Sequence, residues 1–475
     1  MKTTTKNLFI SFLSTFCLVL LLASCKEKEA KTAPVAYEEA LAETASCDCK
    51  PFWFPHSQTP NPKEGKGSPF DTTSTTNCIF HQWSWLKFLY LTRPDTHGNP
   101  LFLNDLVQVD SKMEVIPQQT GANLVLTDTA QAGAGAVLKT NPTLSSDGKP
   151  RTVFYGIFID STLQTAANTF KAQLLDSTLP ASNSEAFPVG SLEIKSSWVS
   201  TDAIPSNEIG NYFVTQAAML QQDGSFKNTS VALLGMHVIG VVENHPEFIW
   251  ATFEHQGMTP LFDWNALTAS STTDLLLFGK GSTTDLSGIT WSSGAPKTPN
   301  QAYTLFQFGV PREKGNTFMS TSQSEPENYN NITNINACVA GNLTDVWNNY
   351  FYNGSLWINM DGKTPEEQVA LLISLGGNLV NSQPGDATRG SVNAANSTME
   401  TFVQTFQSDV SSINNSNLVS CFTCHNAVGH GGATSPLYIS HIFSAYVEAG
   451  KGKTLDEIKT MKLEEFHTML RAKSN

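Results

Sequence analysis

Five consecutive residues near the end of the chain, Cys421-Phe422-Thr423-Cys424-His425, carry the most specific chemistry in the sequence. Two thiols three positions apart can each add to one vinyl group of the same porphyrin, and the imidazole that follows the second thiol can then bind the iron. This is the Cys-x-x-Cys-His pattern by which c-type haem is attached. We therefore predict one haem c, joined to Cys421 and Cys424, with His425 as an axial ligand of the iron.

Three other chemistries fit the same motif. A zinc site needs two further ligands, for which the nearby candidates are His430 and His441. A thioredoxin-like redox pair needs a preceding strand within a βαβ unit, whereas residues 411–420 are rich in Ser and Asn. A structural disulfide between Cys421 and Cys424 is the third alternative.

The motif does not fix the second axial ligand of the iron. Met461 and Met469 are the methionines that follow it, and His430 and His441 are rival candidates. His430 lies between glycines, whereas His441 lies in an apolar stretch that could hold an imidazole beside a haem. We predict His441 as the second metal ligand, which would lower the reduction potential relative to a Met ligand. An open coordination position is the alternative.

The N-terminus has the pattern of an export signal. A short positively charged stretch precedes an apolar run, which ends in Leu-Ala-Ser-Cys at positions 22–25. This ending resembles the lipobox of bacterial lipoproteins, and the resemblance implies that Cys25 becomes the lipid-carrying N-terminus. We predict a signal peptide over residues 1–24 and a flexible, charged tether over residues 25–40.

A lipid anchor of this kind predicts attachment to a membrane of the bacterial cell envelope. Lys26, directly after the lipidated position, favours the outer membrane by resemblance to lipoprotein sorting rules, facing either the periplasm or the cell surface. The formal net charge of −13 argues against nucleic acid as a partner. It is compatible with a basic redox partner protein at the envelope.

Four further cysteines, Cys47, Cys49, Cys78 and Cys338, lie outside the signal and the haem motif. In an oxidising compartment, four cysteines predict up to two disulfides. Because Cys47 and Cys49 are too close in sequence to bridge each other easily, each is expected to reach one of Cys78 and Cys338. A metal site is the alternative.

Hydrophobic patterns divide the rest of the chain into a β-rich body over residues 41–360 and a helical, haem-bearing segment over residues 361–475, so the predicted fold class is α+β. In the body we predict long loops at 265–335, helices at 81–91 and 163–175, and strands at 123–127, 153–159, 192–199, 231–242 and 247–253. In the segment we predict helices at 364–375, 398–407, 435–448 and 454–472.

Polar residues recur within these predicted strands. The strand at 192–199 alternates apolar and polar residues, which predicts a half-buried strand: Leu192, Ile194 and Trp198 against Glu193, Lys195 and Ser197. His237 and His255 lie on two neighbouring predicted strands and could approach each other if these pair. They would then form a metal site or one face of a haem pocket. The alternative is that both are buried and hydrogen-bonded.

The haem motif, together with residues 250–255, 347–350 and 396–402, resembles a group of exported bacterial cytochrome-c-like proteins. The resemblance spans scattered short pieces of the chain and brings no activity with it. It implies roles for Cys421, Cys424 and His425 alone.

These observations favour electron transfer by a lipoprotein at the cell envelope. A haem-dependent oxidoreductase or peroxidase acting on a small molecule is the first alternative, and a surface binding protein with a structural haem is the second. The sequence shows no Ser-His-Asp set and no nucleotide-binding loop. Whether the chain is an enzyme therefore stays open.

Overall fold

The computed structural model describes residues 47–73, 77–132, 137–221, 223–261, 266, 268–285, 328–376, 388–390, 396–401 and 421–451. These residues all fall within one compact unit of the chain. The predicted signal peptide, the tether and Cys25 lie outside the described residues, as do the helix predicted at 454–472 and both Met461 and Met469.

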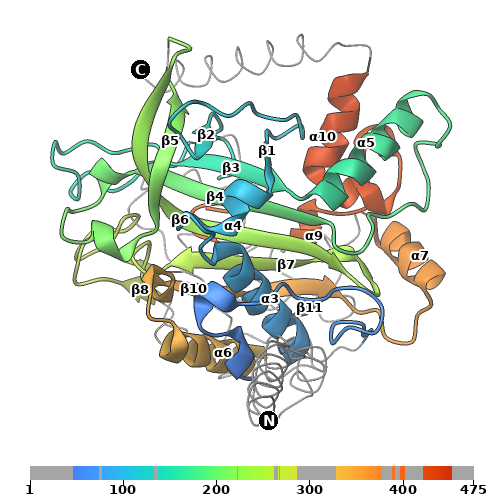
Figure 1. Ribbon diagram of the computed structural model, residues 1–475, viewed down its shortest axis with the longest axis horizontal. Coiled ribbons are helices and arrows are strands. Elements are labelled where there is room, and N and C mark those ends of the chain that lie inside the picture. Colours follow the sequence, from blue (N-terminus) through green and yellow to red (C-terminus); the bar gives the residue numbers. More distant parts are fainter. Residues whose placement is uncertain are drawn as a thin grey trace, which may run out of the picture. The chain divides into compact units, whose positions relative to one another are not determined.

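A nine-stranded sheet forms the centre of the structure (Figure 1). Its main path runs β1-β3-β4-β6-β7-β10-β11, and β5, which pairs with β6, adds β2. All of these pairings are antiparallel except that of β2 with β5. The strands are β1 (Val107–Val109), β2 (Leu124–Leu126), β3 (Phe154–Ile159), β4 (Leu192–Ser200), β5 (Val214–Leu220), β6 (Phe226–Val242), β7 (His245–His255), β10 (Tyr350–Ile358) and β11 (Thr388–Gly390).

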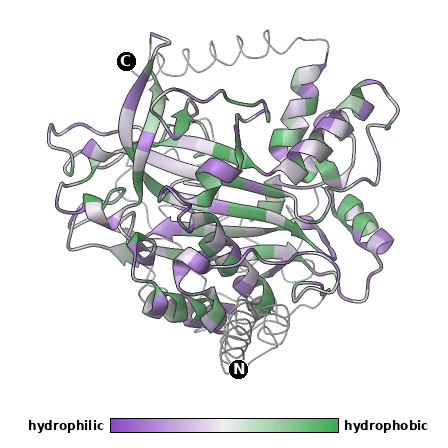
Figure 2. Ribbon diagram, in the orientation of Figure 1, coloured by the Kyte–Doolittle hydropathy of each residue, from purple (hydrophilic) through white to green (hydrophobic). Residues whose placement is uncertain are grey.

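The two central strands are buried along most of their length. From residue 231 onward β6 is entirely buried, and β7 is buried at every position except Pro246. Strands that are covered on both faces read as nearly continuous apolar runs, which is why the patterns at 231–242 and 247–253 predicted them correctly. Figure 2 shows these strands mostly in white to green, with purple concentrated in the connections.

The helix α3 (Asn77–Thr92) covers one face of the sheet. Trp85 and Phe88 both contact Phe253 of β7, with the Phe88 ring stacked at 4.1 Å between centroids. Trp83 approaches β6 so closely that a Cβ on Gly240 would lie 2.7 Å from its ring. α3 is buried on nearly all sides, its polar residues such as His81 and Lys87 included, which is typical of a core helix. It contains the helix predicted at 81–91.

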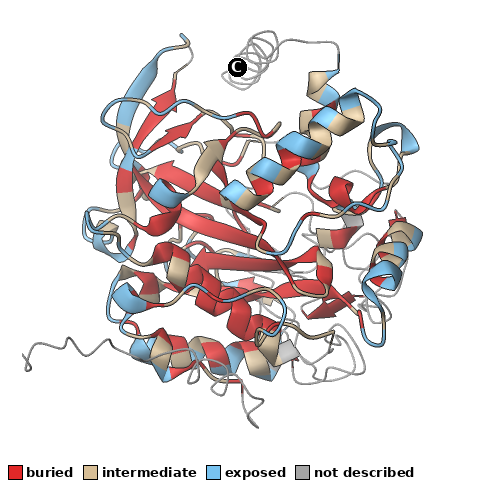
Figure 3. Ribbon diagram, turned by 45° about the vertical axis from the view of Figure 1, so that its right-hand side comes forward, coloured by how far each residue is buried: buried red, intermediate tan, exposed pale blue. Residues whose placement is uncertain are grey.

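The opposite face of the sheet carries an apolar cluster that joins the sheet to the last described part of the chain. Sheet residues such as Ile239 and Trp250 pack there with Phe422, Ile439 and Phe443. Figure 3 shows the central strands mostly in red, with pale blue positions on the outer helices, on loops and at the exposed start of β6. The outer helices include α5 (Ser161–Leu175), α7 (Pro365–Leu375) and α10 (His441–Gly450).

The predicted α+β division, with its helical C-terminal haem segment, is wrong. The structure is a β-rich antiparallel sheet body with few helices, and β11 extends this sheet from within the region predicted to be helical. α7 and α10 bury their apolar residues against the sheet, in the cluster described above, and do not form a separate helical layer. Amphipathic spacing shows that a helix has an apolar face, but it does not show what covers that face.

The loops predicted at 265–335 contain regular structure as well. β8 (Thr268–Ser270) and β9 (Thr283–Asp285) form a two-stranded sheet, and α6 (Asn328–Asn342) contacts both α3 and β10. Short strands and Asn-rich helices carry weak periodicity, so the sequence pattern did not reveal them.

The predicted disulfide partners are confirmed. Cys47 pairs with Cys78 of α3, and Cys49 pairs with Cys338 of α6. The Cα atoms lie 5.4 Å and 5.7 Å apart. Both bonds therefore join the start of the described chain to the helices that cover one side of the sheet.

Candidate functional site

The two thiols of the haem motif lie on one helical turn, α9 (Cys421–Cys424). The backbone N–H of His425 donates to the carbonyl of Cys421 at 2.8 Å, so the helical geometry continues into the histidine. Side chains three positions apart on a helix share a face, which places both thiols on the same side. Cys421 is half-buried and Cys424 is exposed.

One hydrogen bond fixes the orientation of the His425 imidazole. Its Nδ1–H donates to the backbone carbonyl of Ile439 at 3.0 Å. Ile439 ends the short helical turn η11 (Pro436–Ile439), which is anchored in the apolar cluster. Among the described residues, no hydrogen bond to Nε2 of His425 is found. A ring held through Nδ1 presents Nε2 with its lone pair, which is the arrangement of a metal-binding histidine.

Aromatic groups surround this imidazole. The Trp250 ring of β7 lies 4.3 Å from it between centroids, and Phe422 is buried beside Trp250. Burial holds the pKa of His425 well below its usual value, and interactions with His441 and Lys195 lower it further. The imidazole is therefore neutral at physiological pH, as a metal ligand must be.

The structure brings His441 and His425 together. Their rings stack with centroids 3.9 Å apart and an interplanar angle of 25°, and Nε2–H of His441 donates to the carbonyl of Cys424 at 2.8 Å. Two axial ligands of a haem lie on opposite sides of the porphyrin plane, whereas these two rings lie face to face. The assignment of His441 as the second ligand stays a prediction. The rival His430 is exposed.

Beneath the motif, the sheet presents four ionisable side chains that we call the sheet-side ionic cluster: Glu193 and Lys195 of β4, His237 of β6, and Glu400. Lys195 and His237 are direct cross-strand neighbours. Nε2 of His237 and a carboxylate oxygen of Glu400 lie 2.6 Å apart, at hydrogen-bond distance. Their side chains are 10% and 16% exposed, so the pair is largely shielded from water.

Several contacts connect this cluster to the haem motif. The hydroxyl of Ser440, the residue before His441, donates to the carboxylate of Glu193 at 3.2 Å. Burial raises the pKa of the Cys424 thiol, and the negative charge of Glu400 raises it further. The charges of Lys195 and His237 both lower the pKa of His425. The cluster therefore lies within electrostatic range of Cys424 and of His425.

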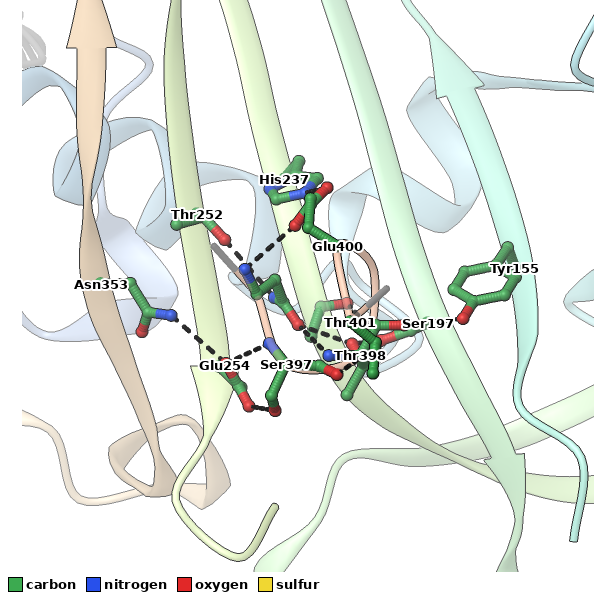
Figure 4. Close-up of polar contacts among 12 residues, drawn as sticks. Tyr155, Ser197, His237, Thr252, Glu254, Asn353, Ser397, Thr398, Glu400 and Thr401 are labelled. Carbon is green, nitrogen blue, oxygen red and sulfur yellow. Dashed lines mark hydrogen bonds and ion pairs between the residues drawn. The ribbon is translucent and has the colours of Figure 1, made fainter. Parts of the chain in front are cut away.

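Glu400 is held in place by a buried segment, residues 396–401, that lies on the sheet (Figure 4). The Asn396 amide donates to the carbonyl of Phe253 at 2.9 Å, and the Asn396 backbone N–H donates to the Glu400 carboxylate at 3.0 Å. A Cβ on Gly235 of β6 would lie 2.5 Å from the Asn396 amide nitrogen. Only glycine at this position leaves room for the segment.

The same segment makes a buried network with the strands on either side. The Ser397 backbone N–H and hydroxyl both donate to the carboxylate of Glu254. The hydroxyls of Thr398 and Ser197 bond to each other at 2.6 Å, and the Tyr155 hydroxyl donates to the Thr398 carbonyl at 2.7 Å. Burial raises the pKa of Glu254 to about 7. Figure 4 shows how these contacts span the strands.

His237 and His255 do not approach each other. The register pairs His237 with Thr252, so His255 lies further along β7. The His255 ring stacks on Tyr212 at 3.6 Å between centroids and is hydrogen-bonded to the Asn211 carbonyl. His255 is thus a buried, hydrogen-bonded histidine, whereas His237 faces the site.

Sequence reasoning missed three parts of this site: Lys195, Glu400 and Trp250. The alternation in β4 did mark Glu193, Lys195 and Ser197 as one face of a strand. That face is covered by the C-terminal part of the chain and does not lie in water, since β4 is buried at seven of its nine positions.

Within the described residues, no group of three or more His, Cys, Asp or Glu side chains forms a metal-binding cluster. No helix in this described part of the chain is long and apolar enough to cross a membrane. Comparisons with protein-family models, with curated proteins and with solved structures gave no match.

Proposed function

We propose that this chain is a c-type cytochrome-like lipoprotein of the bacterial envelope that carries one haem and transfers electrons. The observation that carries the proposal is the arrangement of His425, which directly follows two thiols on one helical turn and presents Nε2 without a hydrogen bond to any described residue. The residues present fit a covalently attached haem. When bound, such a group supplies reversible one-electron chemistry at its iron.

Each residue of the site would have a separate role in attaching the haem, binding its iron or orienting the ligand. Cys421 and Cys424 would each form a thioether bond by adding S–H across a vinyl group, so that sulfur joins one carbon and the hydrogen ends on the other. His425 would bind the iron through Nε2. Ile439 holds this imidazole in orientation, and Trp250 excludes water from its face.

Exposure at one edge of the site favours electron transfer. Cys424 and His441 are both exposed, so a group attached at the motif would lie close to the protein surface. A redox partner protein could reach it there without opening the fold. Lipidation at Cys25 would keep the protein at the envelope, with residues 25–40 as the tether.

A haem-dependent oxidoreductase is the second candidate, and the His237–Glu400 pair favours it. An imidazole–carboxylate pair beside a haem could exchange protons with a small substrate. Spectra separate the two functions. A low-spin haem that binds neither cyanide nor carbon monoxide indicates electron transfer, whereas a ligand-binding haem indicates catalysis.

The test is production of the full chain in a host that matures c-type haem. We expect a pyridine haemochrome spectrum and a protein mass increased by one haem. Replacing Cys421 and Cys424 with Ala removes both attachment points, so covalent haem should be lost completely. His430→Ala, at an exposed neighbouring histidine, is the matched control and should keep the haem. Wild-type protein of unmodified mass would contradict the proposal.

A further inference from the structure

Lys195 is the one member of the sheet-side ionic cluster for which no hydrogen bond and no ion pair within 4 Å to a described residue is found; its electrostatic partner is Glu193 on the same strand. The Lys195 side chain is half-buried on β4. Within the described ranges, its ammonium makes no hydrogen bond and no ion pair, whereas His237 pairs with Glu400 and Glu193 accepts a hydrogen bond from Ser440. A lysine with restricted access to water and without a hydrogen-bonded partner is poorly stabilised unless an anion binds to it.

The surroundings of Lys195 place it beside the haem motif. Glu193 lies two residues before Lys195 on the same face of β4. Its carboxylate accepts a hydrogen bond from the hydroxyl of Ser440, the residue before His441. The direct cross-strand neighbour of Lys195 on β6 is His237. In the next strand, β7, Thr252 pairs with His237, and Trp250 contacts the ring of His425. Lys195 thus lies between Glu193, which contacts the turn before His441, and His237, which is within electrostatic range of His425.

The neighbouring carboxylates stabilise Lys195 only in part. Burial raises the pKa of Glu193, and the charge of Lys195 lowers that pKa without reversing the effect of burial, so Glu193 is a weaker anion than an exposed glutamate. Glu400 is within hydrogen-bond distance of His237 and accepts from the backbone N–H of Asn396. Neither carboxylate forms a hydrogen bond with the Lys195 ammonium, which leaves its hydrogen-bond positions for an anion from outside the described residues.

We propose that Lys195 is an anion-binding residue of the haem site and forms an ion pair with a propionate carboxylate of the attached haem. This inference rests on the proposed function, because haem supplies two carboxylates at one edge of the ring while its vinyl groups are fixed at Cys421 and Cys424. Lys195 is a positioning residue: it binds the periphery of the group and orients its plane over the sheet.

Removal of this charge should be visible in the redox behaviour. A positive charge near the iron favours the reduced form, because reduction adds one electron. Lys195→Met keeps an unbranched apolar stem but removes the ammonium, so its midpoint potential should fall below that of the wild type. Lys195→Arg keeps the charge and should stay close to the wild type. Lys227→Met removes an exposed lysine of β6 as the matched control and should change nothing.

The experiment is spectroelectrochemical titration of the purified haem protein and these three variants, with resonance Raman spectra of the propionate bending mode. A lower midpoint potential and a shifted propionate band in Lys195→Met alone support the proposal. Unchanged values for both in a haem-loaded, folded Lys195→Met protein overturn it and leave the proposed function intact. Wild-type protein without covalent haem overturns the proposed function itself, and this inference with it.

Discussion

The two faces of the central sheet are built from different chemistry. On the α3 face, Trp83, Trp85 and Phe88 are almost completely buried, and the ionisable groups buried there lie in close pairs: Lys87 with Glu64 and His245 with Glu247, each at 2.9 Å. On the motif face, the strands present Glu193, Lys195, His237 and Glu254 to the C-terminal part of the chain. Burial of an ionisable group costs stability unless a partner stabilises it. Lys195 makes no hydrogen bond or ion pair to a described residue, so the comparison indicates that the motif face is the one suited to bind a further group.

The largest effect on stability should come from the α3 face. Trp85→Ala removes a buried ring that contacts Phe88 and Phe253, and we expect it to lower the free energy of unfolding by about 3–5 kcal/mol. The haem spectrum of the folded protein should not change. Denaturant unfolding followed by fluorescence, with spectra of the native state, checks both statements. Phe226→Ala, at a ring that is 41% exposed, is the control. A changed spectrum in Trp85→Ala would show that the two faces are not separate.

A smaller effect, specific to the motif face, should appear as a dependence on pH. The folded-state pKa of Glu254 is about 7, raised by burial from 4.5. The folded protein therefore binds this proton more tightly than the unfolded chain does, and the free energy of unfolding should fall as pH rises from about 4.5 to about 7. The shift corresponds to about 3 kcal/mol. The buried Glu193, whose pKa is also raised, should add to the same trend.

Glu254→Gln isolates this contribution, because the amide does not titrate. Its free energy of unfolding should change less between pH 4.5 and 7 than that of the wild type, as measured by denaturant unfolding at several pH values. Glu448→Gln replaces an exposed carboxylate that pairs with Lys451, and it should keep the wild-type dependence over this window. An undiminished slope in Glu254→Gln would mean that another group is responsible.

The smallest effect should follow from Gly235→Ala. The added methyl group would collide with the Asn396 amide and displace the segment that holds Glu400. We expect a loss of about 1–3 kcal/mol in the free energy of unfolding, typical of overpacking. The haem spectrum or potential should also shift. Gly210→Ala serves as the control, since no atom lies within 4 Å of its added Cβ. If both variants behave alike, the fit of segment 396–401 against β6 is not specific.

The comparison of faces also explains what the sequence could predict. The helix at 81–91 was predicted correctly from apolar residues on helical spacing, and the strand at 231–242 from an almost continuous apolar run. Because Cys47 and Cys49 are too close in sequence to bridge each other easily, the expected partners of both were Cys78 and Cys338, as the structure shows. In both cases, local spacing alone carries the information.

The motif face was predicted less well because it depends on contacts between distant parts of the chain. Glu400 meets His237 across 163 positions of sequence, and Ser440 meets Glu193 across 247. The alternation of apolar and polar residues in β4 identified a polar face of the strand. The same alternation occurs whether that face lies in water or is covered by another segment, so the pattern could not distinguish the two. The spacing in Cys-x-x-Cys-His predicts which residues would bind a haem, and it carries no information on the residues around them.

The two disulfides have a mechanical consequence. Cys47 and Cys49 follow the predicted tether and are bonded to α3 and α6. Any tension on an anchored N-terminus would enter the fold through these covalent links and be borne by the helices on the α3 side. The motif on the opposite face of the sheet has no covalent link of this kind to the N-terminal part of the described chain, so such tension would reach it only through packing contacts across the sheet.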